Sequence, residues 1–146
     1  MGCTASTASS PGQLIPPPVE VPFPNPNGKK TVVIVGASFA GFTVGEYLWE
    51  DYNVVFVDQR DHFEYIPANI KCSVDDKFAD KIFAGFPEMA KGYNDAFKFV
   101  QGRLVFVAKD SNTVEIQVVD GSRKKFHLSY DVLVICTGFC YNAPIK

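Results

Sequence analysis

Apolar positions along the chain fall into short continuous runs separated by stretches with a longer period. The runs at residues 31–36, 53–58 and 132–136 are aliphatic and rich in β-branched residues, which is typical of strands buried on both faces of a parallel sheet. Between the first two runs, residues 39–50 place apolar side chains at helical spacing. The pattern predicts a central parallel sheet with this helix packed on one of its faces.

The pattern changes to a period of two between residues 97 and 129. Apolar and polar side chains alternate there in three stretches, and the two breaks between them are polar; one break contains Asp120-Gly121, a common hairpin turn. We therefore expect a three-stranded antiparallel meander, inserted before the last parallel strand. Its lysine and arginine residues are expected on a solvated face.

A second helical pattern begins at Ser73, where two acidic residues follow in the first turn. Apolar side chains then recur at helical spacing until Pro87 interrupts them, at positions Phe78, Ile82, Phe83 and Phe86. We expect this stripe to lie in the core, with contact to a quinone or a lipid as the alternative. Residues 59–67 predict only an irregular connection.

Residues 1–29 differ in composition from the rest of the chain. They contain seven of the ten prolines, many serines and threonines, and almost no charge. Such a segment cannot bury enough apolar surface to fold, so we expect a disordered tail followed by one domain over residues 30–146.

The first residues of this tail fit the N-myristoylation pattern M-G-x-x-x-[ST], with Gly2 as the acceptor. Cys3 lies beside it and would take a palmitoyl chain, and two acyl chains anchor a protein stably where one does not. The motif predicts a cytoplasmic protein attached to a membrane by its acylated N-terminus. The alternative is a chance match in a low-complexity tail.

Composition and charge narrow the choice of partners. The formal charge of −2 provides no electrostatic basis for binding nucleic acid, and the sequence contains no run of 18 apolar residues that would span a membrane. The cysteines form no C-x-x-C pair and follow no secretory signal, which predicts free thiols in a reducing compartment. Neither His62 nor His127 belongs to a cluster with metal-ligand spacing, so we expect no metal.

The turn between the first strand and the first helix has the pattern G-x-S-x-x-G, formed by Gly36, Ala37, Ser38, Phe39, Ala40 and Gly41. In a strand–turn–helix context this pattern indicates dinucleotide binding. Gly36 would allow the tight turn, Gly41 would allow close packing of the helix, and the helix N-terminus would bind a pyrophosphate. The alternative is a purely structural turn without a ligand.

Two further positions lie where such a ligand would extend. Asp58 ends the second strand about 20 positions after Gly36, the spacing expected for an acid that binds both ribose hydroxyls and repels a 2′-phosphate. Thr137 and Gly138 follow the last strand, at the sheet edge where open α/β sheets bind ligands. Arg60 would lie beside the adenine or be an ordinary surface arginine.

Together these motifs resemble the first FAD segment of the pyridine nucleotide-disulfide oxidoreductase superfamily, nearest to its ferroptosis suppressor and apoptosis-inducing-factor-like branch. The resemblance covers residues 30–146 and implies an α/β, Rossmann-like FAD-binding domain. It implies that residues 36–41 hold the FAD pyrophosphate and Asp58 the ribose. It further implies that Lys71 touches the flavin nucleotide, that the backbone of Val105 contacts the adenine, and that Thr137 and Gly138 form the second turn against FAD.

The resemblance also implies an NAD(P)H-dependent oxidoreductase. The sequence lacks the C-x4-C pair of the disulfide reductases, which favours a quinone-reductase-like enzyme in which the flavin itself reacts. The family's second glycine fingerprint, for NAD(P)H, is not found, so we expect a partial domain that is truncated before the NAD(P)H domain and inactive alone. The alternatives are a single NAD-binding Rossmann module and a non-catalytic, lipid-anchored remnant.

Overall fold

The computed structural model describes residues 19–20, 28–93 and 97–138. In chain order the strands are β1 (Val19–Glu20), β2 (Thr31–Val35), β3 (Asn53–Asp58), β4 (His62–Glu64), β5 (Phe83–Gly85), β6 (Phe97–Ala108), β7 (Thr113–Val118), β8 (Lys125–Ser129) and β9 (Val132–Ile135). The helices are α1 (Phe39–Leu48), α2 (Asn69–Cys72) and α3 (Phe86–Ala90), with the 3-10 helices η1 (Ile66–Ala68), η2 (Asp76–Lys81) and η3 (Lys91–Tyr93).

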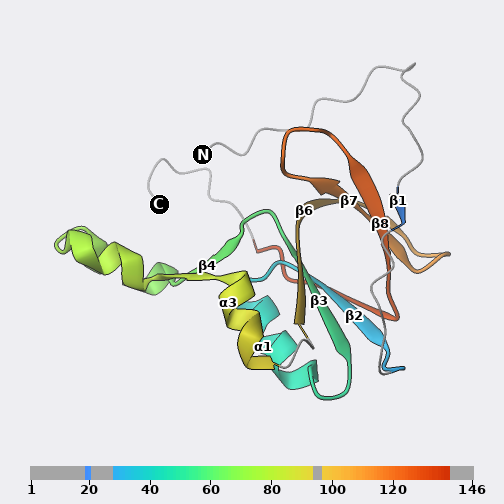
Figure 1. The fold of residues 1–146 in the computed structure, drawn as a ribbon, viewed down its shortest axis with the longest axis horizontal. Coiled ribbons are helices and arrows are strands. Elements are labelled where there is room, and N and C mark those ends of the chain that lie inside the picture. Colours follow the sequence, from blue (N-terminus) through green and yellow to red (C-terminus); the bar gives the residue numbers. More distant parts are fainter. Residues whose placement is uncertain (1–18, 21–27, 94–96, 139–146) are drawn as a thin grey trace.

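The main sheet has seven strands in the order β1-β8-β7-β6-β3-β2-β9 (Figure 1). In its parallel half, β2 lies between β3 and β9, and Val33 pairs with Val55 on one side and with Leu133 on the other. The three predicted parallel strands and the helix that follows the first of them are therefore confirmed. β2 and β3 are aliphatic because both of their faces are covered: Ile34, for example, has no exposed surface.

Strand β6 joins the two halves of the sheet. Its first residues run parallel to β3, from the pair Val54 and Phe97 to the pair Asp58 and Gln101. Its later residues run antiparallel to β7, which in turn pairs antiparallel with β8. The predicted meander is confirmed, but its first strand is also a fourth parallel strand, which the sequence pattern does not indicate. An alternating pattern reports burial of one face and carries no information about strand direction.

The two faces of the sheet have separate cores. Successive strand residues point to opposite faces, so Ile34 and Phe56 lie in one cluster while Val33 and Val55 lie in the other. α1 and α3 cover the first face (Figure 1), and the meander contributes Ile116 and other residues to the second. The parallel sheet is therefore covered by helices on one face and by its own meander on the other.

Two predictions about residues 59–86 are wrong. The connection at 59–67 contains strand β4, and the expected helix over 73–86 is replaced by the 3-10 helix η2 and by strand β5. β4 and β5 pair antiparallel, and the Tyr65 N–H donates to the Ile82 carbonyl at 2.8 Å. The hydrogen bonds that β5 forms with β4 therefore determine the structure here, although the local sequence has helical spacing. Within the predicted stripe, Ile82 and Phe86 are buried, whereas Phe83 is 46% exposed.

A charged pair on the meander gives a pH-dependent prediction. The Lys125 ammonium lies 2.6 Å from the Glu115 carboxylate and, with a smaller contribution from His127, holds the pKa of Glu115 below its ordinary value of 4.5. A depressed carboxylate pKa stabilises the fold above the unfolded-state pKa, and the benefit is lost as pH falls through the folded-state value. We expect Glu115→Gln to reduce the free energy of unfolding at pH 7 by about 1 kcal/mol, and the difference to shrink below pH 4.5. Urea denaturation at pH 7 and at a pH below 4.5 measures the difference between the variant and the wild-type protein. An equal loss of unfolding free energy at the two pH values would contradict the prediction.

Candidate functional site

The turn after β2 is tight and touches the end of β9. Gly36 has a φ of +99°, a region that side chains disfavour, and its N–H donates to the Val57 carbonyl at 2.8 Å. A Cβ built on Gly36 would lie 2.3 Å from the Cys136 carbonyl oxygen and 3.0 Å from the Thr137 nitrogen. Only a glycine therefore allows the main chains after β2 and β9 to approach this closely.

The turn leads directly into the N-terminus of α1. Ser38 is the N-cap residue, and its carbonyl accepts the first helical hydrogen bond from the Phe42 N–H at 2.8 Å. The N–H groups of Phe39, Ala40 and Gly41 precede that bond and so have no acceptor within the helix. They point out of the positive end of the helix dipole, an arrangement that suits a phosphate group.

Gly41 holds this helix end close to the turn. A Cβ at Gly41 would lie 1.8 Å from the Gly36 carbonyl oxygen and 3.2 Å from the Ile34 side chain. Both glycines of the fingerprint therefore have the packing roles predicted from the sequence, whatever the turn binds.

Asp58 is half-buried and ties the end of β3 to the glycine turn. Its Oδ2 accepts a hydrogen bond from the Ala37 N–H at 2.8 Å, and its Oδ1 accepts one from the Arg60 N–H at 2.9 Å. Each carboxylate oxygen has a second lone pair, so both remain able to accept a hydroxyl. The acid expected to bind ribose thus lies against the turn expected to bind pyrophosphate.

The turn at Thr137 and Gly138 lies at the same edge. The Cys136 N–H donates to the Val35 carbonyl at 2.7 Å, which continues the pairing of β9 with β2 up to the glycine turn. Gly138 has a φ of +68°, and no atom of the part of the chain that the structure describes lies within 4 Å of the position of a Cβ there. Three of the predicted elements, the glycine turn, Asp58 and this second turn, are therefore together at the carboxyl ends of parallel strands, where open α/β sheets bind ligands.

Val105 lies beyond this edge on β6. Asp58 pairs with Gln101, and four further residues place Val105 about 13 Å along the strand at about 3.3 Å per residue. The register with β7 shifts between Leu104 and Phe106, so this bulge leaves Val105 out of the pairing. Its position permits a backbone contact with a ligand that extends from Asp58, and that contact stays a prediction.

Lys71 is not brought against the glycine turn. It lies on α2 with its ammonium 4.1 Å from the centre of the Phe78 ring. In Figure 1 the segment at residues 66–81, drawn in light green, extends away from the sheet. Its contact with the flavin nucleotide also stays a prediction.

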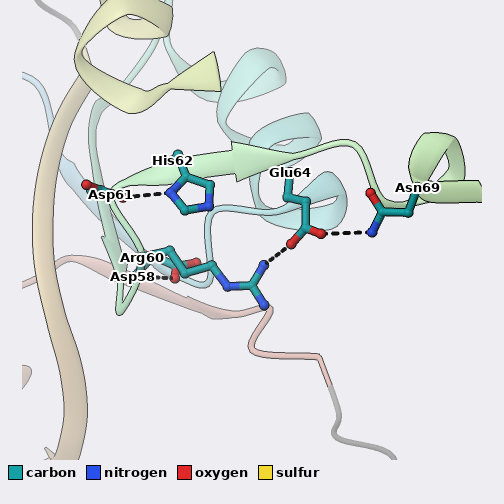
Figure 2. Close-up of polar contacts among 6 residues, drawn as sticks. All are labelled: Asp58, Arg60, Asp61, His62, Glu64 and Asn69. Atoms are coloured by element: carbon teal, nitrogen blue, oxygen red, sulfur yellow. Dashed lines mark hydrogen bonds and ion pairs between the residues drawn. The ribbon is translucent and has the colours of Figure 1, made fainter. Parts of the chain in front are cut away.

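A polar network beside Asp58 was missed by the sequence analysis. Arg60 forms an ion pair with Glu64 at 2.9 Å, and the Asn69 amide donates to the other Glu64 oxygen at 2.9 Å (Figure 2). Next to it, a hydrogen bond from His62 holds the pKa of Asp61 below its ordinary value. The available signal was the run of charges directly after Asp58, but their partners follow from the unpredicted strand β4.

Aromatic side chains form an apolar wall beside the first turn of α1. Phe39 packs edge-on against Phe63 and Tyr65, with ring centres 5.0 and 5.5 Å apart. Phe39 and Tyr65 are nevertheless 41% and 48% exposed. Apolar surface next to a few convergent polar groups is typical of small-molecule sites.

The described residues bear on only part of the membrane and metal predictions. Gly2 and Cys3 lie outside the described residues. Within residues 28–93 and 97–138, no helix is long and apolar enough to cross a membrane. In that same part of the chain, no group of three or more His, Cys, Asp or Glu side chains is arranged to hold a metal ion.

Proteins with related sequences cover most of this chain. No family model matches the chain. Apoptosis-inducing factor homolog A of Dictyostelium discoideum is 30% identical over 118 residues, covering 81% of this chain and 26% of its own length. Ferroptosis suppressor protein 1 of Xenopus tropicalis is 32% identical over 111 residues, covering 73% and 26% respectively.

A solved structure shows the same fold. The reduced CoADR-RHD of Bacillus anthracis superimposes with a TM-score of 0.68 and 19% identity, covering 81% of this chain and 22% of that one. The chain thus spans about a quarter of the length of each of these proteins. These similarities support the predicted pyridine nucleotide-disulfide oxidoreductase superfamily, and within it the branch of the apoptosis-inducing factor homologues and ferroptosis suppressor protein 1.

Proposed function

We propose that the carboxyl edge of the parallel sheet binds the adenosine diphosphate half of FAD, as part of an NAD(P)H-dependent flavoprotein oxidoreductase. The observation that carries the proposal is the hydrogen bond between Asp58 and the Ala37 N–H. This bond holds the Asp58 carboxylate, which would bind the ribose, next to the helix N-terminus, which would receive the phosphates. The similarity to apoptosis-inducing factor homolog A and ferroptosis suppressor protein 1 supports the same assignment.

The residues present fit this half of FAD. The N–H groups of the first turn of α1 would bind the pyrophosphate, and Asp58 would accept the ribose hydroxyls. Val105 and the turn at Thr137 and Gly138 would border the adenine and the flavin side. A bound flavin would supply a ring that accepts hydride, whereas these residues bind and orient the nucleotide.

Two more specific proposals follow: the electron acceptor is of the quinone type, and the isolated chain is inactive. The quinone proposal is supported by the lack of a C-x4-C pair in the sequence. Hydride transfer requires the nicotinamide to be held against the flavin, and the glycine fingerprint at residues 36–41 is already assigned to the adenosine of FAD. We therefore propose that the chain alone adds no NADH:quinone turnover above free FAD. A single NAD-binding module and a non-catalytic remnant remain the competing functions.

Replacing Asp58 tests the nucleotide site. The amide of Asp58→Asn has one acceptor oxygen, so it cannot serve both the Ala37 and the Arg60 N–H groups, and it loses the charge that favours ribose hydroxyls. We expect FAD and 5′-ADP binding to weaken by about 1–3 kcal/mol, which is about five- to 150-fold in Kd. Isothermal titration calorimetry measures both ligands.

Asp131 provides a matched control. Its Oδ2 accepts the Thr31 N–H at 2.7 Å, so it makes the same kind of bond as Asp58 but at the opposite end of β2. Asp131→Asn removes the same charge, but its amide oxygen can still accept the Thr31 N–H, so its Kd for 5′-ADP should stay unchanged. If the two variants weaken 5′-ADP binding equally, Asp58 is a structural residue and the proposed site is wrong.

We also propose that the N-terminus is acylated at Gly2 and Cys3 and attaches the protein to membranes. The motif and its setting in a proline-rich segment support this. Gly2→Ala should abolish myristoylation and shift the protein from the membrane pellet to the supernatant, whereas Cys3→Ser should leave weaker, reversible binding. Metabolic labelling with a myristate analogue and cell fractionation measure the two effects, and a Gly2→Ala protein that still sediments with membranes would contradict the proposal.

A further inference from the structure

The ion pair between Arg60 and Glu64 places a cation and its neutralising anion beside the proposed ribose site. We propose that Glu64 is a positioning residue that withholds the charge of Arg60 from the ribose, so that the site selects adenosine nucleotides with a free 2′-hydroxyl over those with a 2′-phosphate. This inference rests on the proposed binding of a nucleotide at Asp58.

Arg60 starts from the ribose-binding acid itself. Its backbone N–H donates to Asp58 Oδ1 at 2.9 Å, so the base of its side chain is fixed at the carboxylate. Figure 2 shows the side chain starting beside Asp58 and extending to Glu64, where Nη1 lies 2.9 Å from Oε2. The guanidinium is half exposed. Because its side chain starts at the Asp58 carboxylate, a guanidinium released from Glu64 would be free to turn toward a group bound there.

Glu64 is held in place independently of Arg60. Its side chain is 22% exposed, and its second oxygen accepts a hydrogen bond from the Asn69 amide at the start of α2. An exposed ion pair of this kind contributes little to stability. Its main effect at this location is electrostatic: it neutralises the arginine and directs the guanidinium donors away from Asp58.

The chemistry of the 2′-position gives this effect a consequence. A carboxylate at the ribose accepts hydrogen bonds from a 2′-hydroxyl and repels a 2′-phosphate, whereas a free arginine nearby accommodates the phosphate. With Glu64 present, Arg60 is neutralised, so the ligand experiences only the repulsion between the Asp58 carboxylate and a 2′-phosphate. Removing the Glu64 charge would release Arg60 and relax the selection.

The experiment compares ADP-ribose with 2′-phospho-ADP-ribose, which differ only in the 2′-phosphate, by isothermal titration calorimetry on the full chain. We expect the wild-type protein to prefer ADP-ribose and Glu64→Gln to shift the ratio of the two Kd values by about fivefold toward the phosphorylated ligand at low salt. Glutamine keeps an acceptor for Asn69, so the fold and the start of α2 are retained. The shift should shrink as salt is added, because the released guanidinium is exposed.

Two further variants separate the role of Glu64 from a change in overall charge. Glu46→Gln removes the same charge from α1, where the carboxylate accepts a hydrogen bond from Tyr93 at 2.6 Å, and it should leave the ratio unchanged. Arg60→Met combined with Glu64→Gln should abolish the shift, since the released cation is gone. A shift in Glu46→Gln, or a shift that persists in the double variant, would overturn the inference.

The remaining outcomes distinguish the inference from the function on which it rests. If the wild-type protein binds neither nucleotide, the proposed function fails and the inference fails with it. If it binds ADP-ribose but the ratio is the same in Glu64→Gln, the site stands and Glu64 has no part in selecting the ligand.

Discussion

Gly41→Ala is expected to lower the free energy of unfolding by at least about 3 kcal/mol, the upper range for overpacking a site that cannot relax. The added Cβ would lie 1.8 Å from the Gly36 carbonyl oxygen, which is main chain in a turn already closed against β9. Relieving this clash requires α1 to move away from β2. The hydrophobic cluster between α1 and the sheet would then be opened to water. Urea denaturation followed by far-UV circular dichroism measures the loss.

Gly121→Ala is the matched control, since it adds the same methyl group at the turn between β7 and β8. No atom of the described residues lies within 4 Å of the position of its Cβ, and its φ of +81° alone should cost about 1–2 kcal/mol. Equal losses in the two variants would show that the close approach of α1 to the turn is not required.

Phe56→Ala is expected to cost about 3–5 kcal/mol, the usual range for removing a buried aromatic ring. Phe56 is 3% exposed and contacts the rings of Phe42 and Phe97 at centre distances of 5.9 and 5.2 Å. The cavity would lie between α1 and β3, two residues before Asp58 on the same strand. Thermal or urea unfolding measures the loss, and Phe106→Ala, at a position 62% exposed, should change stability by no more than about 0.5 kcal/mol.

A double-mutant cycle tests whether the Phe56 ring requires the space left by the absent side chain of Gly45. A Cβ on Gly45 would lie 2.4 Å from Cζ of the Phe56 ring, so Gly45→Ala alone should be destabilising. Phe56→Leu removes that atom, and the combined variant should be more stable than the sum of the two single losses predicts. Simple additivity would mean that the ring moves aside freely.

The parallel core was predictable because its signal is local. Three aliphatic runs and a helical stretch define strands and helix without knowledge of the rest of the chain, and the carboxyl ends of parallel strands must meet at one edge. That reasoning brought Gly36, Asp58 and Thr137 together before the structure did. The dual pairing of β6 was not predictable in this way, because one alternating strand serves two partners of opposite direction.

The region after Asp58 shows where sequence reasoning ends. Phe83 and its neighbours have helical spacing, yet they pair with β4 about 20 residues earlier, and only the pairing partner decides between the two structures. The contacts among Arg60, Glu64 and Asn69 depend on that strand. The second role of Asp58, as an acceptor for the Ala37 N–H, likewise depends on a distance that spacing alone does not supply.

The central position of β2 has a consequence for synthesis of the protein. Its neighbour β9 comes late: Thr31 and Asp131, which bond at the start of the β2 and β9 pairing, are 100 positions apart. At about 5–20 residues per second, the ribosome needs about 5–20 s to make that interval. Throughout it β2 has at least one unpaired edge, which is a template for any other extended chain. Two nascent copies on one polysome are therefore most prone to pair wrongly at β2, and slower translation before β9 lengthens the period of risk.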